Sequence, residues 1–478
     1  MVFQQSSLSP RRTHLAFYRW LLLFGLVFLL KAVEKSTLRK RFEASFESAC
    51  SKYAFVERHQ RLLSSPKTSS SYFIYSFHEK QYKKAGGLGD RLAGLITATA
   101  FALGTNRVLL IKAEDTFFTS SFAPYSFKQN NDRNFNYADW RWSGWMPSLN
   151  TTTLHCLNPR TPKCSLTSSS SAYLDSYQVV KYRSNRNFLC YWLLLQSRQS
   201  KKLRTAFHAL NITQYSNLFE VSGCLLRLSL WPTDSFWSTF EETYLRKQKE
   251  FKHGGVSTST TLPLGTFQVG FHYRCGDASF SSTKINYQCY VNTSVQPWRG
   301  TDFIDSMTLD SPIDFAKCGQ RIINHRLAKH AVQKDEIPRM VSFISSDYSL
   351  AAHQIRSNLA NTSVVLPSQS ACHLESSVKS KLCMEDTMFN WFQLAMSDVL
   401  IVQSGRKKKE KRSYSEEEKK ERKKEKEPRA PASAFSRYAA IYGLLDNVNL
   451  RFARECVEVD TYKIGWSDNG NWLCSSIY

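Results

Sequence analysis

The sequence predicts an α/β protein in which two Rossmann-like domains face each other after a membrane-anchor helix at the amino terminus. Three observations predict this class: an apolar run near the start of the chain, and two separate regions where strand and helix patterns alternate. In both regions a loop with glycine or charged residues directly follows a strand, where ligands bind in open parallel sheets. At 478 residues, the chain is long enough to bury two cores.

The composition sets broad limits on partners. The formal net charge is +24 at pH 7, which favours phosphate-bearing small molecules, membrane headgroups or nucleic acid. Hydrophobic residues make up 42% and aromatic residues 13%, which excludes a wholly disordered or fibrous protein. No nucleic-acid recognition motif is visible, so we expect no nucleic-acid partner.

Residues 15–33 are predicted to be a transmembrane signal anchor that follows a short tail over residues 1–14. The segment contains WLLLFGLVFLL (Trp20–Leu30), and only Arg19 and Lys31 are charged within it. About 20 apolar residues span a bilayer. A cleaved signal peptide is the alternative, but charged residues follow the run in place of a small-residue cleavage site.

Two features favour the secretory pathway. The chain has 12 cysteines and no CxxC pair, which fits disulfides better than zinc, although free buried cysteines remain the alternative. The second feature is a set of four N-glycosylation sequons, at Asn150, Asn211, Asn292 and Asn361. The Lys/Arg counts on either side of the anchor, in contrast, do not favour a lumenal carboxyl terminus. On the two features together, we expect a single-pass type II protein of the Golgi or endoplasmic reticulum membrane with a lumenal catalytic region.

The first domain is expected over residues 72–254, after a charged stem over residues 34–71. Tyr72–Phe77 has strand composition, Asp90–Leu103 has apolar residues at helical spacing, and Arg107–Ile111 is a second strand. Strand, glycine loop, helix and strand make one parallel α/β unit.

The second domain is expected over residues 265–478, after a linker over residues 255–264 with the composition HGGVSTSTTLPL nearby. Strands and helices alternate again in this region. The predicted strands are Thr266–Phe271, Val341–Ile344, Val364–Leu366 and Val399–Gln403, and the predicted helices are Tyr348–Leu359, Met384–Ser397 and Ser433–Leu445.

The glycine loop before the first helix has the sequence GGLGD and includes Gly87 and Gly89. Helix-start amides carry partial positive charge and bind phosphate groups. The spacing fits neither the dinucleotide fingerprint nor a Walker loop. A tight turn needed only for packing is the alternative interpretation.

The sequence HYRCGD follows the first strand of the second domain and contains His272, Arg274 and Asp277. Arginine is the natural bidentate partner of a diphosphate. When a nucleoside diphosphate leaves, charge grows on its β-phosphate, and a fixed guanidinium there stabilises the transition state. A core histidine, a surface ion pair and a turn cap are the alternatives for the three residues.

A low-complexity insert occupies residues 406–432, and its segment Arg406–Glu427 holds 12 basic and 7 acidic residues. The insert separates SDVLIVQSG (Ser397–Gly405) from SAFSRYAAIYG (Ser433–Gly443), which otherwise join as strand, loop and helix. A nuclear-localisation signal is the alternative for its KKKEKR motif. The chain has no Asp-x-Asp, HExxH or GxSxG motif and no zinc-spaced Cys/His set, so no metal or other cofactor is expected.

Three blocks together resemble the fucosyltransferase superfamily that includes α1,2-, α1,6- and protein O-fucosyltransferases. They are GGLGDRLAGL…ALGTNRVLLI, VGFHYRCGD, and FISSD…NWFQLAMSDVLIVQSG…SAFSRYAAIYG. The resemblance implies a GT-B-like fold, a GDP-fucose donor, a glycan or glycoprotein acceptor, and metal-independent transfer with inversion. It implies that Arg274 and Asp277 are catalytic. The implied donor-binding residues are Gly87, Gly89, Asp90, Arg91, His272, Arg274, Asn390, Asp398, Ser433, Phe435 and Ser436.

The chain departs from the family pattern at three places. Asp90 stands where many relatives have asparagine, Asn390 stands where relatives often have an acidic guanine contact, and the insert splits a loop expected to touch phosphate. The insert has three alternative interpretations: it loops out and leaves the pocket intact, it impairs the enzyme, or it is a non-coding stretch retained in the gene model. The alternative functions are therefore transfer from another nucleotide sugar, or an inactive carbohydrate- or partner-binding protein on the same fold.

Overall fold

The computed structural model of the chain describes residues in both expected domains. The predicted anchor, the predicted linker and residues 408–432 of the insert lie outside the described residues. Those described are 38–63, 71–78, 87–113, 120–125, 150–156, 175–185, 187, 189, 201–213, 215–250, 267–273, 307–308, 311–333, 340–346, 349–360, 362–366, 381–404, 406–407, 434–445, 447–452 and 455–460.

The first sheet has four strands in the order β2-β1-β5-β4, and all its neighbouring pairs are parallel. The helix α3 (Leu88–Gly104) connects β1 to β2, as its apolar spacing predicts. The predicted ends of β1, α3 and β2 agree with the observed ends to within two residues. The strands are β1 (Tyr72–His78), β2 (Val108–Ala113), β4 (Thr151–Cys156) and β5 (Val179–Ser184).

The second sheet has six strands in the order β10-β9-β7-β11-β13-β14. Numbered in chain order, these strands run 3-2-1-4-5-6, which is the order of the Rossmann fold. Only β14 departs from the parallel direction, because it pairs antiparallel with β13. The strands are β7 (Phe267–Tyr273), β9 (Met340–Ser346), β10 (Ser363–Val365), β11 (Val399–Ser404), β13 (Asn447–Phe452) and β14 (Glu455–Asp460).

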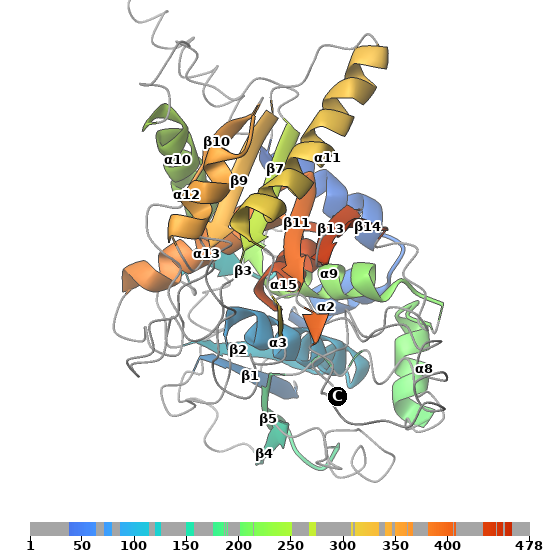
Figure 1. Cartoon of the computed structure of the whole chain (residues 1–478). Helices are drawn as coiled ribbons and strands as arrows, with labels where there is room; N and C mark the ends of the chain where they lie inside the picture. The colour runs from blue at the N-terminus through green and yellow to red at the C-terminus, as the bar shows by residue number, and fades with distance from the viewer. Residues whose placement is uncertain are drawn as a thin grey trace, which may run out of the picture.

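The helices α13 (Lys381–Ala395) and α15 (Ala434–Gly443) lie between the two sheets (Figure 1). α15 packs against α13, and also against α3 and against α9 (Leu218–Ser229) from the first half of the chain. One hydrophobic cluster therefore joins side chains from both sides of the predicted linker. The helices α11 (Pro312–Gln333) and α12 (Ser349–Ser357) cover the other face of the second sheet, where a second cluster forms.

Aromatic rings form much of the first cluster. The ring of Phe392 on α13 packs edge-on against Trp237 and Phe240 of α10 (Asp234–Glu250), at centroid distances of 5.2 and 4.9 Å. Aromatic pairs of this geometry add to the free energy gained from burial. The contact explains how helices far apart in the sequence hold the two sheets in one arrangement.

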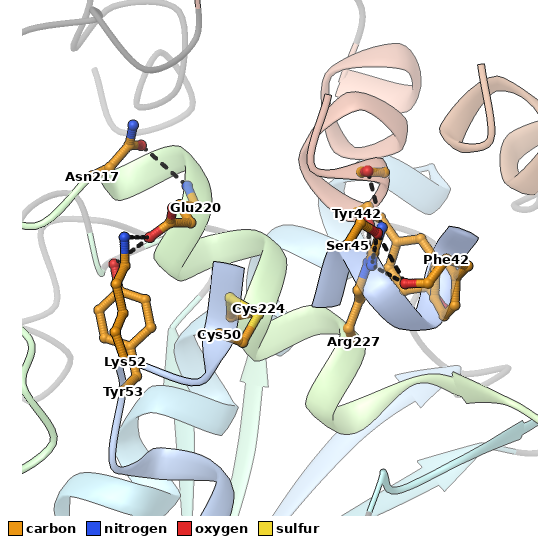
Figure 2. Close-up of a disulfide and its surroundings, with 11 residues drawn as sticks. Phe42, Ser45, Cys50, Lys52, Tyr53, Asn217, Glu220, Cys224, Arg227 and Tyr442 are labelled. Atoms are coloured by element: carbon orange, nitrogen blue, oxygen red, sulfur yellow. Dashed lines mark hydrogen bonds and ion pairs between the residues drawn. A yellow bond between two sulfur atoms is a disulfide. The ribbon is translucent and has the colours of Figure 1, made fainter. Parts of the chain in front are cut away.

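The expected stem differs from the structure over residues 38–63. Residues 38–50 are helical, α2 (Phe55–Leu63) follows, and Phe42 and Phe46 are only 1% and 2% exposed in the core. The disulfide Cys50–Cys224 ties this segment to α9 across 174 residues of sequence (Figure 2). The burial of Phe42 and Phe46 and the disulfide show that this part of the expected stem belongs to the folded body. The sequence does not indicate it clearly, because charged residues alternate with the apolar residues of these helices.

The sequence does not predict several further elements. In the region over residues 113–250, which lacks a clear apolar period, these include α8 (Lys201–Ala209) and the short strands β3 (Phe122–Ala123) and β6 (Trp231–Pro232). Beyond that region they include the two-residue strands β8 (Met307–Thr308) and β12 (Arg406–Lys407). β12 places the first residues of the insert in an antiparallel pair with β8. Within the described part of the chain, no helix is both long and apolar enough for a membrane span.

Candidate functional site

The candidate site lies where the carboxyl ends of β7 and β11 meet. Strand order reverses between these two strands, and open α/β sheets bind ligands at such a switch point. His272 is near the carboxyl end of β7, is 7% exposed, and is in register with Ser345 of β9 and Val402 of β11. The predicted location of His272 at a strand end is confirmed, although β7 continues through Tyr273.

The start of α15 lies against this strand end. The ring of Phe435 stacks on the His272 ring, with centroids 5.3 Å apart and an angle of 30° between the planes. Ser436 is fully buried in the same helical turn. The structure thus brings together two sequence blocks that are more than 160 residues apart.

The start of α3 reaches the same place from the first sheet. A Cβ atom added at Gly89 would lie 2.4 Å from the carbonyl carbon of Ala434 and 2.6 Å from its carbonyl oxygen. Two amino-terminal helix turns are therefore in direct contact, and only glycine permits the approach. Since α3 follows β1 and α15 follows β11, the carboxyl edges of the two parallel sheets face each other here.

In the described part of the chain, the N-cap position of α3 supplies no side-chain hydrogen bond to the first turn. Gly87 is the N-cap residue and makes no side-chain hydrogen bond, whereas in α9 the side chain of Asn217 accepts from the amide of Glu220. Among the residues that the structure describes, none has an atom within 4 Å of a Cβ placed at Gly87. Uncapped first-turn amides and the positive end of the helix dipole suit an anion.

Charged groups gather behind the two helix starts. Arg91 and Arg437 are each 3% exposed. Burial lowers the pKa of Arg437, while the nearby Tyr438 and Asp90 act in the opposite direction. Asp90 therefore serves partly as a counter-charge to buried arginine. Arg437 was not among the predicted site residues, and the only signal was an arginine within the apolar helix sequence SRYAAIYG.

The hydroxyl of Tyr75 on β1 fixes the first turns of α3. It donates to the carbonyl oxygens of Arg91 and Ser184, at 2.7 and 2.9 Å. Burial raises the pKa of Tyr75, and the Arg91 charge opposes that rise. A Cβ atom at Gly94 would lie 2.0 Å from the Ser184 carbonyl oxygen, so this glycine allows the helix to approach the end of β5.

Asp398, one of the predicted donor-binding residues, lies apart from this point. Asp398 precedes β11 at the amino edge of the sheet, where its carboxylate accepts from Arg41 at 2.8 Å and from the Gln268 amide at 2.7 Å. Gln268 and His272 are four strand residues apart, which is about 13 Å. Asp398 is thus a structural ion-pair partner in this arrangement. Asn390 is buried in α13 at 4% exposure.

Burial raises the pKa of Asp398, and the neighbouring charge of Arg41 opposes that rise. The guanidinium and the backbone amide each occupy one oxygen of this carboxylate and so fix its orientation toward the amino edge of the sheet. This environment agrees with its position away from the switch point.

Other predicted residues lie outside the described part of the chain. They are Arg274, Asp277 and Ser433 of the site, and Asn292 and Asn361 of the sequons. The remaining sequon residues are exposed: Asn150 donates to the Ser176 carbonyl at 3.0 Å, and Asn211 donates to the Lys52 carbonyl at 3.1 Å. Among the residues that the structure describes, no group of three or more His, Cys, Asp or Glu side chains is placed to hold a metal ion.

The fold and site define an α/β protein with two mainly parallel sheets, whose carboxyl edges meet at a polar, anion-suited point. The chain matches no protein-family model and no curated protein. Among solved structures it is similar to NodZ alpha-1,6-fucosyltransferase co-crystallized with GDP, with 12% identity and a TM-score of 0.34 over 82% of this chain and 99% of that chain.

A second similar structure is fucosyltransferase NodZ from Bradyrhizobium, with 12% identity and a TM-score of 0.33. A third is NodZ alpha-1,6-fucosyltransferase soaked with GDP-fucose, with 13% identity and a TM-score of 0.34. Each of these matches covers 82% of this chain and 99% of the other.

Proposed function

We propose that this protein is a glycosyltransferase that transfers fucose from GDP-fucose to a glycan or glycoprotein acceptor, with inversion and without a metal ion. The sequence blocks supply the resemblance, and the meeting of two helix starts at Gly89 and Ala434 is the observation that carries the proposal. That contact joins the glycine block, the His272 block and the SAFS block at one switch point.

The proposed chemistry uses the positive ends of α3 and α15. In glycosyl transfer the bond between the anomeric carbon and the β-phosphate oxygen breaks, and negative charge grows on the departing nucleoside diphosphate. In this proposal the positive poles at the starts of α3 and α15 stabilise that charge. Arg274 follows His272 by two residues in the sequence. We propose that its guanidinium neutralises the β-phosphate as the nucleoside diphosphate leaves.

We also propose a type II membrane protein of the Golgi or endoplasmic reticulum, with residues 15–33 as the anchor and the folded part in the lumen. The disulfide Cys50–Cys224 supports an oxidising compartment, and Cys156 and Cys318 are disulfide-bonded as well. The division into domains over residues 72–254 and 265–478 remains part of this proposal. One apolar cluster contains side chains from both ranges.

Donor titration tests the proposed function. The full-length chain, purified in mild detergent, is titrated with GDP, GDP-fucose, GDP-mannose and UDP-sugars, and release of GDP is followed with an acceptor mixture. We expect GDP and GDP-fucose to bind and Arg274→Ala to abolish GDP release while leaving thermal unfolding unchanged. Arg321→Ala, an exposed arginine on α11, is the matched control and should retain activity.

Each alternative has its own outcome in the same experiment. Preference for a uridine donor would replace fucose transfer by transfer of another sugar. Absence of any nucleotide binding would favour an inactive carbohydrate- or partner-binding protein, for which the insert between β11 and α15 is the motivation. Full activity of Arg274→Ala would remove the proposed role of that side chain.

A further inference from the structure

The arginine at position 227 lies at the far end of α15 from the site and carries a buried charge. Arg227 is on the last turn of α9 and is 1% exposed. Figure 2 shows its side chain pointing toward Tyr442 on α15 and toward Phe42 and Ser45 on the amino-terminal helix. One guanidinium therefore contacts two other helices at once.

The hydrogen bonds of Arg227 go to the end of α15. Its Nε donates to the Tyr442 carbonyl at 2.5 Å, and its Nη2 donates to the Gly443 carbonyl at 2.9 Å. The last four carbonyls of a helix have no donor within the helix and carry its negative pole. Arg227 supplies both hydrogen bonds and positive charge at that pole.

The same guanidinium holds the helix over residues 38–50. Nη1 donates to the Phe42 carbonyl at 2.8 Å and to the Ser45 hydroxyl at 2.7 Å, and the Phe42 ring lies 4.0 Å from the guanidinium carbon. The disulfide Cys50–Cys224 joins this helix to α9 one turn away from Arg227. The planar fork of arginine suits several carbonyls at fixed angles, which the rotating ammonium group of lysine does not reproduce.

Because α15 is a single helix, the position of its carboxyl end determines the position of its amino end. Ten residues of α-helix extend about 15 Å, and the element is buried along most of its length, so it moves as a rigid unit. Its last carbonyls rest on Arg227, whereas its first residues, Ala434 and Phe435, contact Gly89 and His272 in the candidate site.

We propose that Arg227 is a positioning residue for the donor site: by holding the carboxyl end of α15, it sets where the amino end of that helix meets the departing diphosphate. This inference rests on the proposed function. It concerns a side chain that does not touch the donor and that no sequence motif singled out.

The test compares Arg227→Lys with the wild-type full-length chain by calorimetric titration of GDP, well below the temperature of unfolding. Lysine keeps the charge and removes the fork, so we expect the Kd for GDP to rise about tenfold, with one GDP still bound per chain. Arg321→Lys makes the same exchange at an exposed position and should leave the Kd unchanged.

Stoichiometry separates positioning from a merely structural role. If Arg227 only stabilised the fold, the variant would bind GDP at the wild-type Kd with fewer sites per chain, and that result would overturn the proposal. Should Arg227→Lys fail to fold, Ser45→Ala removes a single acceptor of the guanidinium. We expect Ser45→Ala to raise the Kd about threefold at full stoichiometry, and an unchanged Kd would overturn the proposal.

The outcomes also separate this inference from the proposed function. A wild-type chain that does not bind GDP refutes both. A wild-type chain that binds GDP, with a Kd that is the same in Arg227→Lys, refutes the positioning role alone.

Discussion

Replacing Gly89 by alanine is expected to push apart the starts of α3 and α15. The new methyl carbon would lie 2.4, 2.6 and 2.7 Å from the carbonyl carbon, carbonyl oxygen and Cβ of Ala434. The two nearest of these atoms are backbone atoms of another helix, so no side-chain rotation relieves the contact. Ordinary contact starts at 3.4 Å, and the helix starts must therefore separate by about 1 Å.

The expected cost to stability is small and the expected cost to binding is large. Overpacking costs about 1–3 kcal/mol, and alanine returns up to about 1 kcal/mol as a better helix former than glycine. At roughly 2 cal/mol/K of unfolding entropy per residue, a chain of this size loses only about 1–2 °C in thermal midpoint. A 1 Å displacement of binding groups costs up to about 100-fold in rate, so we expect the Kd for GDP to rise at least about tenfold.

Calorimetric titration with GDP and scanning calorimetry of the full-length chain measure these two quantities. Gly87→Ala is the matched control for stability, because a methyl group there meets none of the described residues within 4 Å and the backbone φ of −69° accommodates alanine. Its thermal midpoint should stay within about 1 °C of the wild-type value, at the usual cost of alanine at an N-cap. Since Gly87 belongs to the candidate site, this control does not extend to GDP affinity.

Two results would refute the reasoning. If Gly89→Ala bound GDP with wild-type affinity, the meeting of α3 and α15 would not form the nucleotide site. If the affinity recovered in Gly89→Ala, Ala434→Gly, the clash would involve only the Ala434 Cβ atom, whereas the two closer backbone atoms remain in that double variant.

Three further predictions concern stability. The double variant Cys50→Ala, Cys224→Ala opens a loop of 174 residues; the chain-entropy estimate gives a loss of up to about 5 kcal/mol, and an unchanged midpoint in thermal denaturation would contradict the role of this disulfide. Burial lowers the pKa of His59 from 6.5 to about 4, so the unfolded state binds more protons between these pH values and stability should fall as pH decreases from 6.5 to 4, by about 3 kcal/mol. His59→Leu should flatten this part of the stability profile in denaturant titrations at several pH values, and an identical slope would exclude His59 as its source. Asp398→Asn should lower stability by about 1 kcal/mol, since its ion pair with Arg41 is partly exposed, and should leave the Kd for GDP unchanged; a weakened Kd would return Asp398 to the donor site.

The local patterns of the sequence predicted the strands and helices with a clear apolar period. β1, α3, β2, β7, β9, α13, β11 and α15 all lie where expected, with ends that differ by a few residues. The elements from α8 to α10 were not foreseen, because tertiary contacts such as Phe392 against Trp237 decide their burial. Residues 38–50 were interpreted as stem because charged side chains such as Arg39 and Arg41 alternate with the buried rings, and their partners, Asp234 and Asp398, are distant in sequence.

By itself, the sequence determined that glycine and histidine blocks follow strands of two parallel units, since apolar periodicity and turn residues act within short stretches of chain. Only the tertiary structure decided that Gly89 and Ala434 touch, that Asp398 lies at the opposite edge from His272, and that Arg227 holds the far end of α15. These facts depend on contacts between elements that are more than 100 residues apart in the sequence, and no local pattern encodes such contacts.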